Sequence, residues 1–265
     1  MSKLATIGTL AAIVLLSSGQ AHADLRTSLR RGTLTVTGTR AGSALHIDEY
    51  EDTIVVRSVS VSRSGLEVEE SESFPADEVS NVSVRTGTHS VAVVNLQNGQ
   101  NLTVRGGGSA EVILVSGYYG DVSISSGGGN DYVAITEMSA DGETDIRTGG
   151  GHDYCFVSNC EFFGDVDVAM GTGDDDLFIG GSDFCVAPPT DDDEPVEDEM
   201  DIDIRLNGNG GTDLWVFEGN SLDLSEFVVR FENEDEDEDE DEEEEEDDEE
   251  EELSLIHISE PTRPY

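Results

Sequence analysis

Four aspartates follow glycine-rich turns at a nearly constant spacing along the chain. Each turn contains two or three glycines, and the aspartates are Asp131, Asp153, Asp175 and Asp213. Glycine adopts positive φ without penalty and lets backbones approach closely, so that carbonyl groups can point toward one spot. A carboxylate beside such carbonyls suits a hard cation, since Ca²⁺ takes about six to eight oxygen ligands at roughly 2.3–2.6 Å. One turn offers too few oxygens, but two stacked turns could supply enough.

The turns recur about every 22 residues, and a fixed period of this length predicts a repeat fold. The residues that follow successive turns are His89, Ala110, Asp131, Asp153, Asp175 and Asp213. Two places later stand Val91, Val112, Val133, Cys155, Leu177 and Trp215, and four places later Val93, Leu114, Ile135, Val157, Ile179 and Phe217. This apolar alternation puts both sets on one buried face of a strand. The last spacing is longer than the others because an acidic insertion occupies 187–199.

Units this short cannot bury their apolar face alone, but stacked units form a continuous core. The sequence therefore predicts an all-β protein: a parallel β-solenoid, either a β-roll or a small β-helix, over residues 80–231. Residues 24–79 are less regular and are expected to be a β cap over the N-terminal sheet edge. An antiparallel sandwich is the alternative, although its strands have no reason to repeat at a fixed period.

Stacking would bring carboxylates of like charge together. Equivalent residues of adjacent coils lie about 4.8 Å apart, where two carboxylates repel by roughly 3 kcal/mol at an effective dielectric of about 20. A cation between them would explain such a column, whereas local Asx turns or splayed, solvated turns are the alternative. A second column on another edge is expected to hold Asp121, Glu143, Asp165 and Asp203. The first two turns have His89 and Ala110 instead, and we expect them to be structural only.

The turns are similar to the haemolysin-type, or RTX, calcium-binding repeats, whose consensus is Gly-Gly-x-Gly-x-Asp-x-apolar-x. The matching stretches are SGGGNDYVA (126–134), TGGGHDYCF (148–156), MGTGDDDLF (170–178) and GNGGTDLWV (208–216). The resemblance implies a calcium-binding β-roll in which the four aspartates coordinate Ca²⁺ with the carbonyls of Gly127, Gly129, Gly149, Gly151, Gly171, Gly173, Gly208 and Gly210. Typical RTX repeats run as tandem nonapeptides, whereas this motif occurs only once in each repeat of the chain, so the number of sites stays open.

The two ends of the chain differ from the repeats. Residues 1–23 read as a bacterial-type signal peptide, with Lys3, a short apolar run and a small-residue cleavage site before Asp24. We therefore expect an exported protein, secreted, periplasmic or at the cell surface, with no membrane insertion after cleavage. Residues 232–252 form an acidic, disordered tract, and 253–265 resemble the translation of a sequencing-library adapter and are expected to be non-native.

The net charge limits the classes of binding partner, and the cysteine content limits the possible disulfides. The net charge is −47, of which 20 negative charges lie in residues 232–252, so the repeats are acidic too. This argues against nucleic acid and anionic membranes as partners and favours cations. Export favours a disulfide, and Cys160 and Cys185, which both fall in the second-turn region of neighbouring copies, are the predicted pair. Cys155 occupies a core column and is expected to be a buried thiol.

No motif of a nucleophilic or metal-dependent hydrolase is present, and we expect the protein not to be an enzyme. The expected role is structural, adhesive or binding, with calcium and an extracellular polysaccharide or surface protein as partners. One alternative is a lyase-like enzyme acting on polysaccharide, although the repeats offer mainly Arg105, Arg147 and Arg205 as basic groups. The other alternative is a calcium-independent scaffold. Outside the core columns lies an aromatic stripe: Tyr132, Tyr154, Phe156 and Phe178.

Overall fold

The structure is a computed structural model that describes residues 25–38, 44–62, 65–87, 91–184 and 203–222. They lie in the first of two compact units, 1–233, whereas the predicted signal peptide, acidic insertion, acidic tract and adapter-like tail fall outside the described residues. The strands are β1 Leu25–Arg30, β2 Thr33–Gly38, β3 Ala44–Tyr50, β4 Thr53–Ser62, β5 Gly65–Pro75, β6 Asn81–Arg85, β7 Val91–Arg105, β8 Val112–Gly128, β9 Tyr132–Ala140, β10 Thr144–Gly150, β11 Tyr154–Ser158, β12 Glu161–Phe162, β13 Val166–Thr172, β14 Asp176–Gly180, β15 Asp183–Phe184, β16 Ile204–Asn207 and β17 Leu214–Glu218. A 3₁₀ turn, η1 (Ala76–Glu78), follows β5. Within these ranges no helix has the length and apolarity needed to cross a bilayer.

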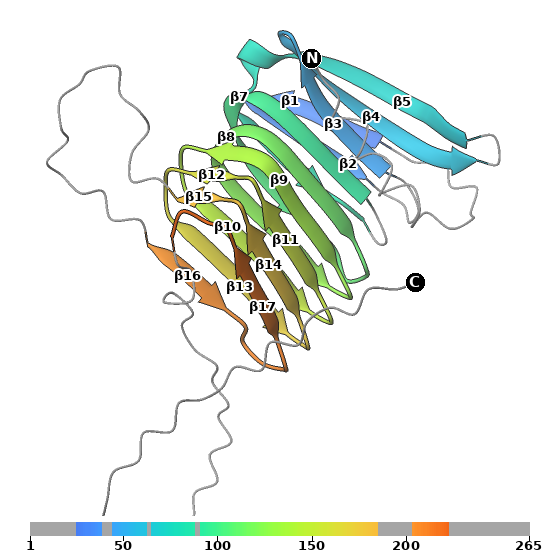
Figure 1. The fold of residues 1–265 in the computed structure, drawn as a ribbon. Helices are drawn as coiled ribbons and strands as arrows, with labels where there is room; N and C mark the ends of the chain where they lie inside the picture. Colours follow the sequence, from blue (N-terminus) through green and yellow to red (C-terminus); the bar gives the residue numbers. More distant parts are fainter. Residues whose placement is uncertain (1–24, 39–43, 63–64, 88–90, 185–202, 223–265) are drawn as a thin grey trace, which may run out of the picture. The chain divides into compact units, whose positions relative to one another are not determined.

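Residues 80–231 were predicted to form a parallel β-solenoid, and the pairing confirms that fold (Figure 1). β10 lies between β8 and β13 in parallel, with Ile146 opposite both Ile124 and Val168. β11 lies between β9 and β14 in the same way. Each coil therefore contributes one segment to a first sheet (the last part of β8, then β10, β13 and β16) and one to a second sheet (the first part of β8, then β9, β11, β14 and β17). A short third side is built from the middle of β8 and the end of β9 with β12 and β15.

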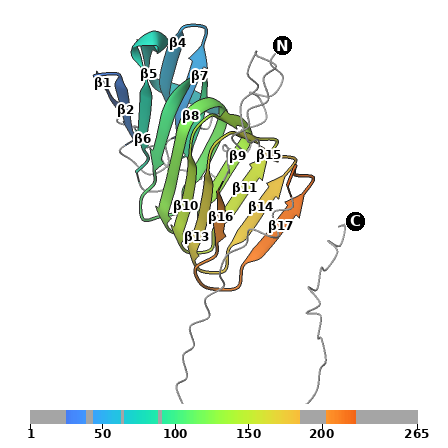
Figure 2. The ribbon, with the colours of Figure 1, turned by 90° about the vertical axis from the view of Figure 1, so that its left-hand side faces the viewer.

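The N-terminal strands extend both sheets of the solenoid (Figure 2). β2 pairs with β6 and β3 pairs with β7, both in parallel, so the parallel stack already begins inside the predicted cap. Antiparallel strands close the N-terminal end of this parallel stack. On the first sheet β1 pairs with β2, and on the second sheet β4 pairs with β3 and β5 pairs with β4. The Leu25 amide of β1 donates to Glu70 of β5 at 2.9 Å and joins the two edges.

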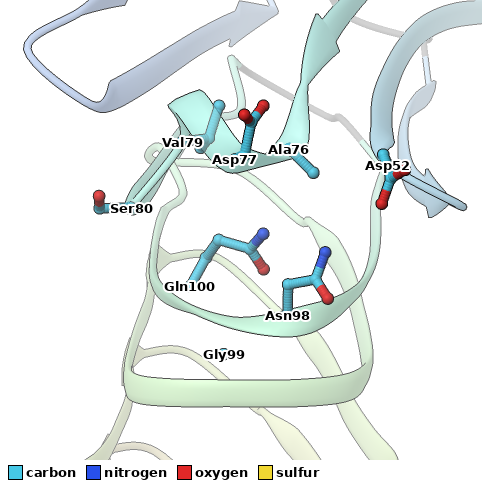
Figure 3. A pocket seen from close by; sticks show the side chains of 8 residues that line it. All are labelled: Asp52, Ala76, Asp77, Val79, Ser80, Asn98, Gly99 and Gln100. Atoms are coloured by element: carbon cyan, nitrogen blue, oxygen red, sulfur yellow. The ribbon is translucent and has the colours of Figure 1, made fainter.

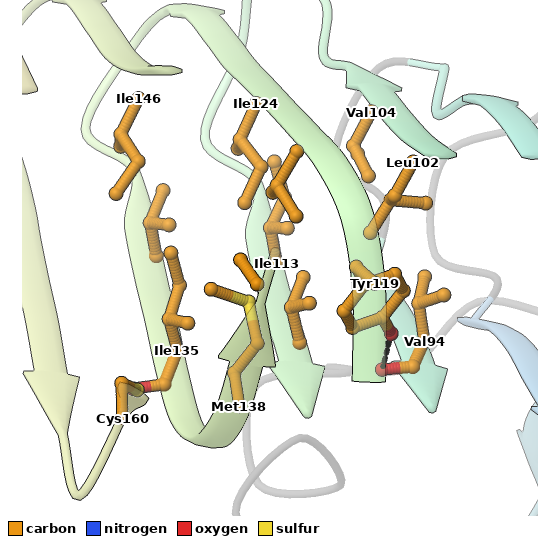
Figure 4. Close-up of a cluster of buried hydrophobic side chains, with 14 of the residues drawn as sticks. Val94, Leu102, Val104, Ile113, Tyr119, Ile124, Ile135, Met138, Ile146 and Cys160 are labelled. Carbon is orange, nitrogen blue, oxygen red and sulfur yellow. Dashed lines mark hydrogen bonds between the residues drawn. The ribbon is translucent and has the colours of Figure 1, made fainter. Parts of the chain in front are cut away.

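A continuous apolar core fills the space between the sheets (Figure 4). Ile124 and Ile146 of the first sheet face Ile135 of the second, and all are at most 1% exposed. Tyr119 is fully buried, and its hydroxyl donates to the carbonyl of Ser116 at 2.7 Å. The inward columns therefore match the predicted alternation from Val133 onward.

The predicted core columns are one residue out of register in the first two copies. Ala92 lies opposite Ile113, and Ile113 lies opposite Val133, so these residues face inward in place of Val91 and Val112. Two positions further on, Val94 and Val115 take the inward places predicted for Val93 and Leu114. Both runs, VAVV and VILV, are apolar at every position, and alternation cannot fix the face of such a run.

Cys155 is fully buried, as predicted, and burial raises the pKa of its thiol to about 12. Cys160 is also a free, buried thiol rather than the predicted disulfide partner. Its Sγ points into the core and donates to the carbonyl of Ile135 at 3.5 Å (Figure 4). Its proposed partner, Cys185, lies outside the described residues.

Candidate metal centre

The glycine turns join the first sheet to the second, and stacking requires their glycines. Gly149 has φ of +102°, and a Cβ there would lie 1.7 Å from the carbonyl oxygen of Gly127 in the preceding coil. Gly151 has φ of +139°, and its Cβ would lie 1.9 Å from the carbonyl oxygen of Gly129. Positive φ recurs at the other predicted turn glycines of these copies: Gly127, Gly129, Gly171 and Gly173.

These contacts change the role expected of the glycine carbonyls. The carbonyl oxygens of Gly127 and Gly129 lie against the glycines of the next coil, along the direction of stacking. The sequence instead suggested carbonyls directed at one common point. The close approach of coils therefore explains the glycines by itself, whether or not an ion is bound.

In the fourth turn the glycines occupy different places from those predicted. A Cβ on Gly211, which has φ of +117°, would lie 1.8 Å from the carbonyl oxygen of Gly173, so Gly211 is the equivalent position. Asn209, at φ of +60°, takes the place of Gly171. Gly208 and Gly210 are therefore not the counterparts of the earlier turn glycines. A Cβ on Gly208 would lie 2.1 Å from Oδ2 of Asp213, so its lack of a side chain makes room for that carboxyl group.

The aspartates after the turns form a ladder between coils. The N–H of Asp131 donates to Oδ1 of Asp153 at 2.8 Å, and the N–H of Asp153 donates to Oδ1 of Asp175 at 2.8 Å. The N–H of Asp175 donates to Oδ1 of Asp213 at 3.0 Å. All four predicted aspartates therefore lie in one column, each accepting a hydrogen bond from the coil before it.

A fifth carboxyl group, which the sequence analysis missed, heads this column. The N–H of Glu111 donates to Oδ1 of Asp131 at 2.8 Å, and Oε1 of Glu111 accepts the N–H of Gly107 at 2.8 Å. Ala110, which was predicted to hold this place, is exposed instead. The turn therefore does have a carboxylate, that of Glu111. The one-residue shift of the VILV run moves Glu111 into the column, and His89 lies outside the described residues. We call Glu111, Asp131, Asp153, Asp175 and Asp213 the carboxyl column.

The second oxygens of the carboxyl column are buried without a partner. Relative exposure is 1% for Glu111, 3% for Asp131 and Asp153, and 0% for Asp175. Within the described part of the chain no hydrogen bond reaches Oε2 of Glu111 or Oδ2 of Asp131, Asp153, Asp175 and Asp213. A buried acceptor left unpaired costs about 1–3 kcal/mol, and more if it is charged. Five in a row therefore need a binding partner or a proton.

Burial raises the pKa of every member of the carboxyl column. It raises the pKa of Glu111 to about 7, and the neighbouring charge of Asp131 adds to the effect. It raises the pKa of Asp175 to about 6, with further contributions from Asp153 and Asp213. The pKa values of Asp131, Asp153 and Asp213 are raised as well, chiefly by burial.

The other predicted acidic column lies in solvent, and its hydrogen bonds run the opposite way, from the N–H of the later coil to the carboxylate of the earlier one. We call Asp121, Glu143, Asp165 and Asp203 the exposed acidic column; all four are exposed. The N–H of Glu143 donates to Oδ1 of Asp121 at 3.2 Å, and the N–H of Asp203 donates to Oδ1 of Asp165 at 3.0 Å. Water can solvate these carboxylates, so their stacking does not require a cation.

Other charged and aromatic side chains lie on the outer faces. Arg147 pairs with Asp145 and, at 3.4 Å, with Asp167, while Arg205 pairs with Asp203. The rings of Tyr132 and Tyr154 stack at 5.3 Å, and those of Phe156 and Phe178 stack at 4.9 Å. These four aromatic residues stand outside the buried columns, as the alternation predicts.

The carboxyl column is a line of groups and not a cage. Across the described ranges, no three or more Asp, Glu, His or Cys side chains converge closely enough to hold one metal ion. An ion in the column would therefore take carboxylate oxygens from two adjacent coils and complete its shell with other oxygens.

Comparisons with family models, curated proteins and solved structures found no match to this chain.

Proposed function

We propose that this protein is a calcium-binding β-solenoid with a structural or binding role outside the cell. In this proposal Ca²⁺ lies between adjacent members of the carboxyl column, on their second oxygens. The observation that carries the proposal is that these five buried oxygens have no hydrogen-bond partner within the described chain. The resemblance of the turns to RTX repeats supports Ca²⁺ as the ion, and the predicted signal peptide supports a location outside the cell.

Charge favours a cation over a purely structural ladder. Ionised neighbours about 4.8 Å apart would repel by roughly 3 kcal/mol at an effective dielectric of about 20. Asp131, Asp153 and Asp175 are at most 3% exposed, so water relieves little of this repulsion. A divalent cation between two carboxylates would convert the repulsion into attraction and would satisfy the unpaired oxygens.

Distance and ligand chemistry favour Ca²⁺ among common cations. Half of the spacing between coils is about 2.4 Å, which falls within the range of Ca²⁺–oxygen bonds. Mg²⁺ needs shorter bonds of about 2.0–2.1 Å in octahedral geometry and retains water. The column offers oxygen ligands, whereas zinc prefers sulfur and nitrogen.

The alternative is a calcium-independent scaffold in which protons hold the column together. The raised pKa of Glu111, about 7, specifically favours this state, because its carboxyl group would then be half protonated near neutral pH. Protons and Ca²⁺ would compete for the same oxygens. The two proposals therefore differ in whether calcium stabilises the fold at pH 7.5.

The test is thermal unfolding of the chain from Asp24 onward, followed by circular dichroism at pH 7.5 in EGTA, in Ca²⁺ and in Mg²⁺. We expect Ca²⁺ to raise Tm and Mg²⁺ to raise it much less. Asp153→Asn keeps the shape of the side chain and removes its charge, so it should abolish the two sites that include Asp153 and lose about half of the calcium shift. Asp165→Asn, in the exposed acidic column, is the matched control and should keep it.

The control matters because the acidic tract at 232–252 could bind calcium weakly without affecting the fold. Equal Tm values in EGTA and Ca²⁺ for the unmodified chain would contradict the proposal and favour the scaffold. An equal loss of the calcium shift in both variants would place binding outside the carboxyl column.

A further inference from the structure

A cavity of about 420 Å³ lies apart from the glycine turns, where the N-terminal strands meet the first coil (Figure 3). Its upper wall is η1, including Ala76 and Asp77, and its floor is the bend of β7 at Asn98 and Gln100. Asp52, between β3 and β4, closes one side. The volume falls within the range of pockets that bind small organic molecules, about 300–1,000 Å³.

Gln100 is the buried polar group of this cavity. Its side chain is 3% exposed, and no hydrogen bond within the described residues reaches its Oε1, which is buried. Figure 3 shows its amide directed into the space beneath Ala76 and Asp77. Buried side-chain acceptors in native proteins are nearly always paired, so a hydrogen-bond donor from a ligand would complete this site.

The neighbouring groups also present acceptors. The Asn98 amide nitrogen donates to Oε1 of Glu49, and the backbone N–H of Gln97 donates to Oε2 of Glu49 at 2.8 Å. Glu49 is 8% exposed, so it holds this bend of β7 firmly and leaves Oδ1 of Asn98 as an acceptor. The Asp52 carboxylate lies across the space from Gln100 in Figure 3.

The ionisable side chains around the cavity are all acidic. Among the described residues that line it, the ionisable side chains are Asp52 and Asp77, both acidic and both exposed at the rim. The chain carries a net charge of −47, which raises the local concentration of cations around it. The space is larger than one metal ion needs, so these acceptors fit an organic cation better than a bare ion.

We propose that this cavity binds a small organic cation carrying a primary ammonium group. An ammonium supplies three hydrogen-bond donors and a positive charge, which match the acceptors of Gln100 and Asn98 and the carboxylate of Asp52. The site is independent of the carboxyl column and does not rest on calcium binding.

The test compares glucosamine hydrochloride with glucose, which replaces the ammonium by a hydroxyl at nearly the same size. Each is titrated into the ¹⁵N-labelled full chain at about pH 6.5, where the amine is protonated. We expect glucosamine to shift the side-chain amide signals of Gln100 and Asn98 and the backbone signal of Gly99, and glucose to leave them unchanged. Asp52→Asn should weaken glucosamine binding by about tenfold or more, because it removes a charged acceptor at the rim.

Asp165→Asn, in the exposed acidic column, also removes one surface charge and should leave the affinity within about twofold. Equal shifts from glucose and glucosamine would overturn the requirement for an ammonium. Glucosamine would be tested at 20-fold or higher excess over protein, up to roughly 50 mM, to cover weak affinities. If the Gln100 signals do not shift under these conditions, the site itself is overturned. Equal losses in both variants would reduce the effect to general attraction by the acidic surface.

Discussion

The carboxyl column and the exposed acidic column both stack acidic residues of adjacent coils. In the carboxyl column the N–H of the earlier coil donates to the later carboxylate, as at Asp153, whereas in the exposed column the N–H of the later coil donates to the earlier carboxylate, as at Asp165. In the exposed column water reaches the second oxygen, whereas in the carboxyl column that oxygen is buried and unpaired within the described chain. The comparison teaches that stacking acidic residues is tolerable by itself, and that burial turns the stack into a candidate ion or proton site.

The largest expected effect comes from breaking the turn that buries the carboxyl column. Gly127→Ala would place a Cβ 2.1 Å from the carbonyl oxygen of Gly107 at φ of +105°, so both backbone strain and overlap oppose it. We expect a loss of at least about 3 kcal/mol in the free energy of unfolding, measured by urea denaturation. Gly128→Ala is the matched control, since its Cβ would meet no atom closer than 3.9 Å. Similar losses in the two variants would contradict the stacking argument.

The second prediction is a pH dependence that the carboxyl column should produce. Burial raises the pKa of folded Glu111 from 4.5 to about 7, so the folded state keeps a proton that the unfolded chain has lost. In EGTA, stability should therefore be greatest near pH 4.5 and should fall as the pH rises to about 7. Saturating Ca²⁺ should flatten this dependence by replacing the protons. A Tm in EGTA that rises between pH 5 and 7 would show the opposite linkage.

The smallest expected effect is a change in the pH dependence of Tm when one carboxyl group of each column is replaced. Glu111→Gln removes the member of the carboxyl column whose pKa burial raises to about 7, so the slope of Tm against pH between 5 and 7 should decrease in EGTA. Its free energy of unfolding at pH 7.5 should change by less than about 1 kcal/mol, because lost repulsion offsets lost hydrogen bonding. Glu143→Gln, in the exposed acidic column, should leave the slope unchanged. An unchanged slope in Glu111→Gln would assign the pH dependence to the aspartates alone.

Much of the fold was predictable because the period and the alternation reinforce each other. From Val133 onward the aspartate after each glycine turn marks the register, since the inward residues lie two and four places after it, and the glycine turns fix where each coil ends. The runs VAVV and VILV follow no such aspartate, so their register depends on pairing with neighbouring coils. Glu111 was missed for that reason: its place depends on a shift that the local sequence does not encode.

The remaining features depend on contacts between distant residues. Gln100 lines a cavity with Asp52 and η1, which come from earlier parts of the chain, and no spacing in the sequence indicates this meeting. Cys160 was paired with Cys185 because both fall in the second-turn region of neighbouring copies, whereas in the structure Cys160 packs inward as a free thiol. In the fourth turn the predicted glycines, Gly208 and Gly210, lie one position too early, because Asn209 occupies the place that is a glycine in the earlier turns.

The antiparallel strands at the N-terminal end have a consequence for self-association. A parallel stack with a flat open edge is a template on which further chains can add, as in amyloid. Here β1 and β5 form the outer edges, and the Leu25 amide of β1 donates to Glu70 of β5. Glu70 and Glu72 of β5 are both exposed, and their charges would repel the same edge of a second molecule. Fibril elongation from this end is therefore opposed by charge.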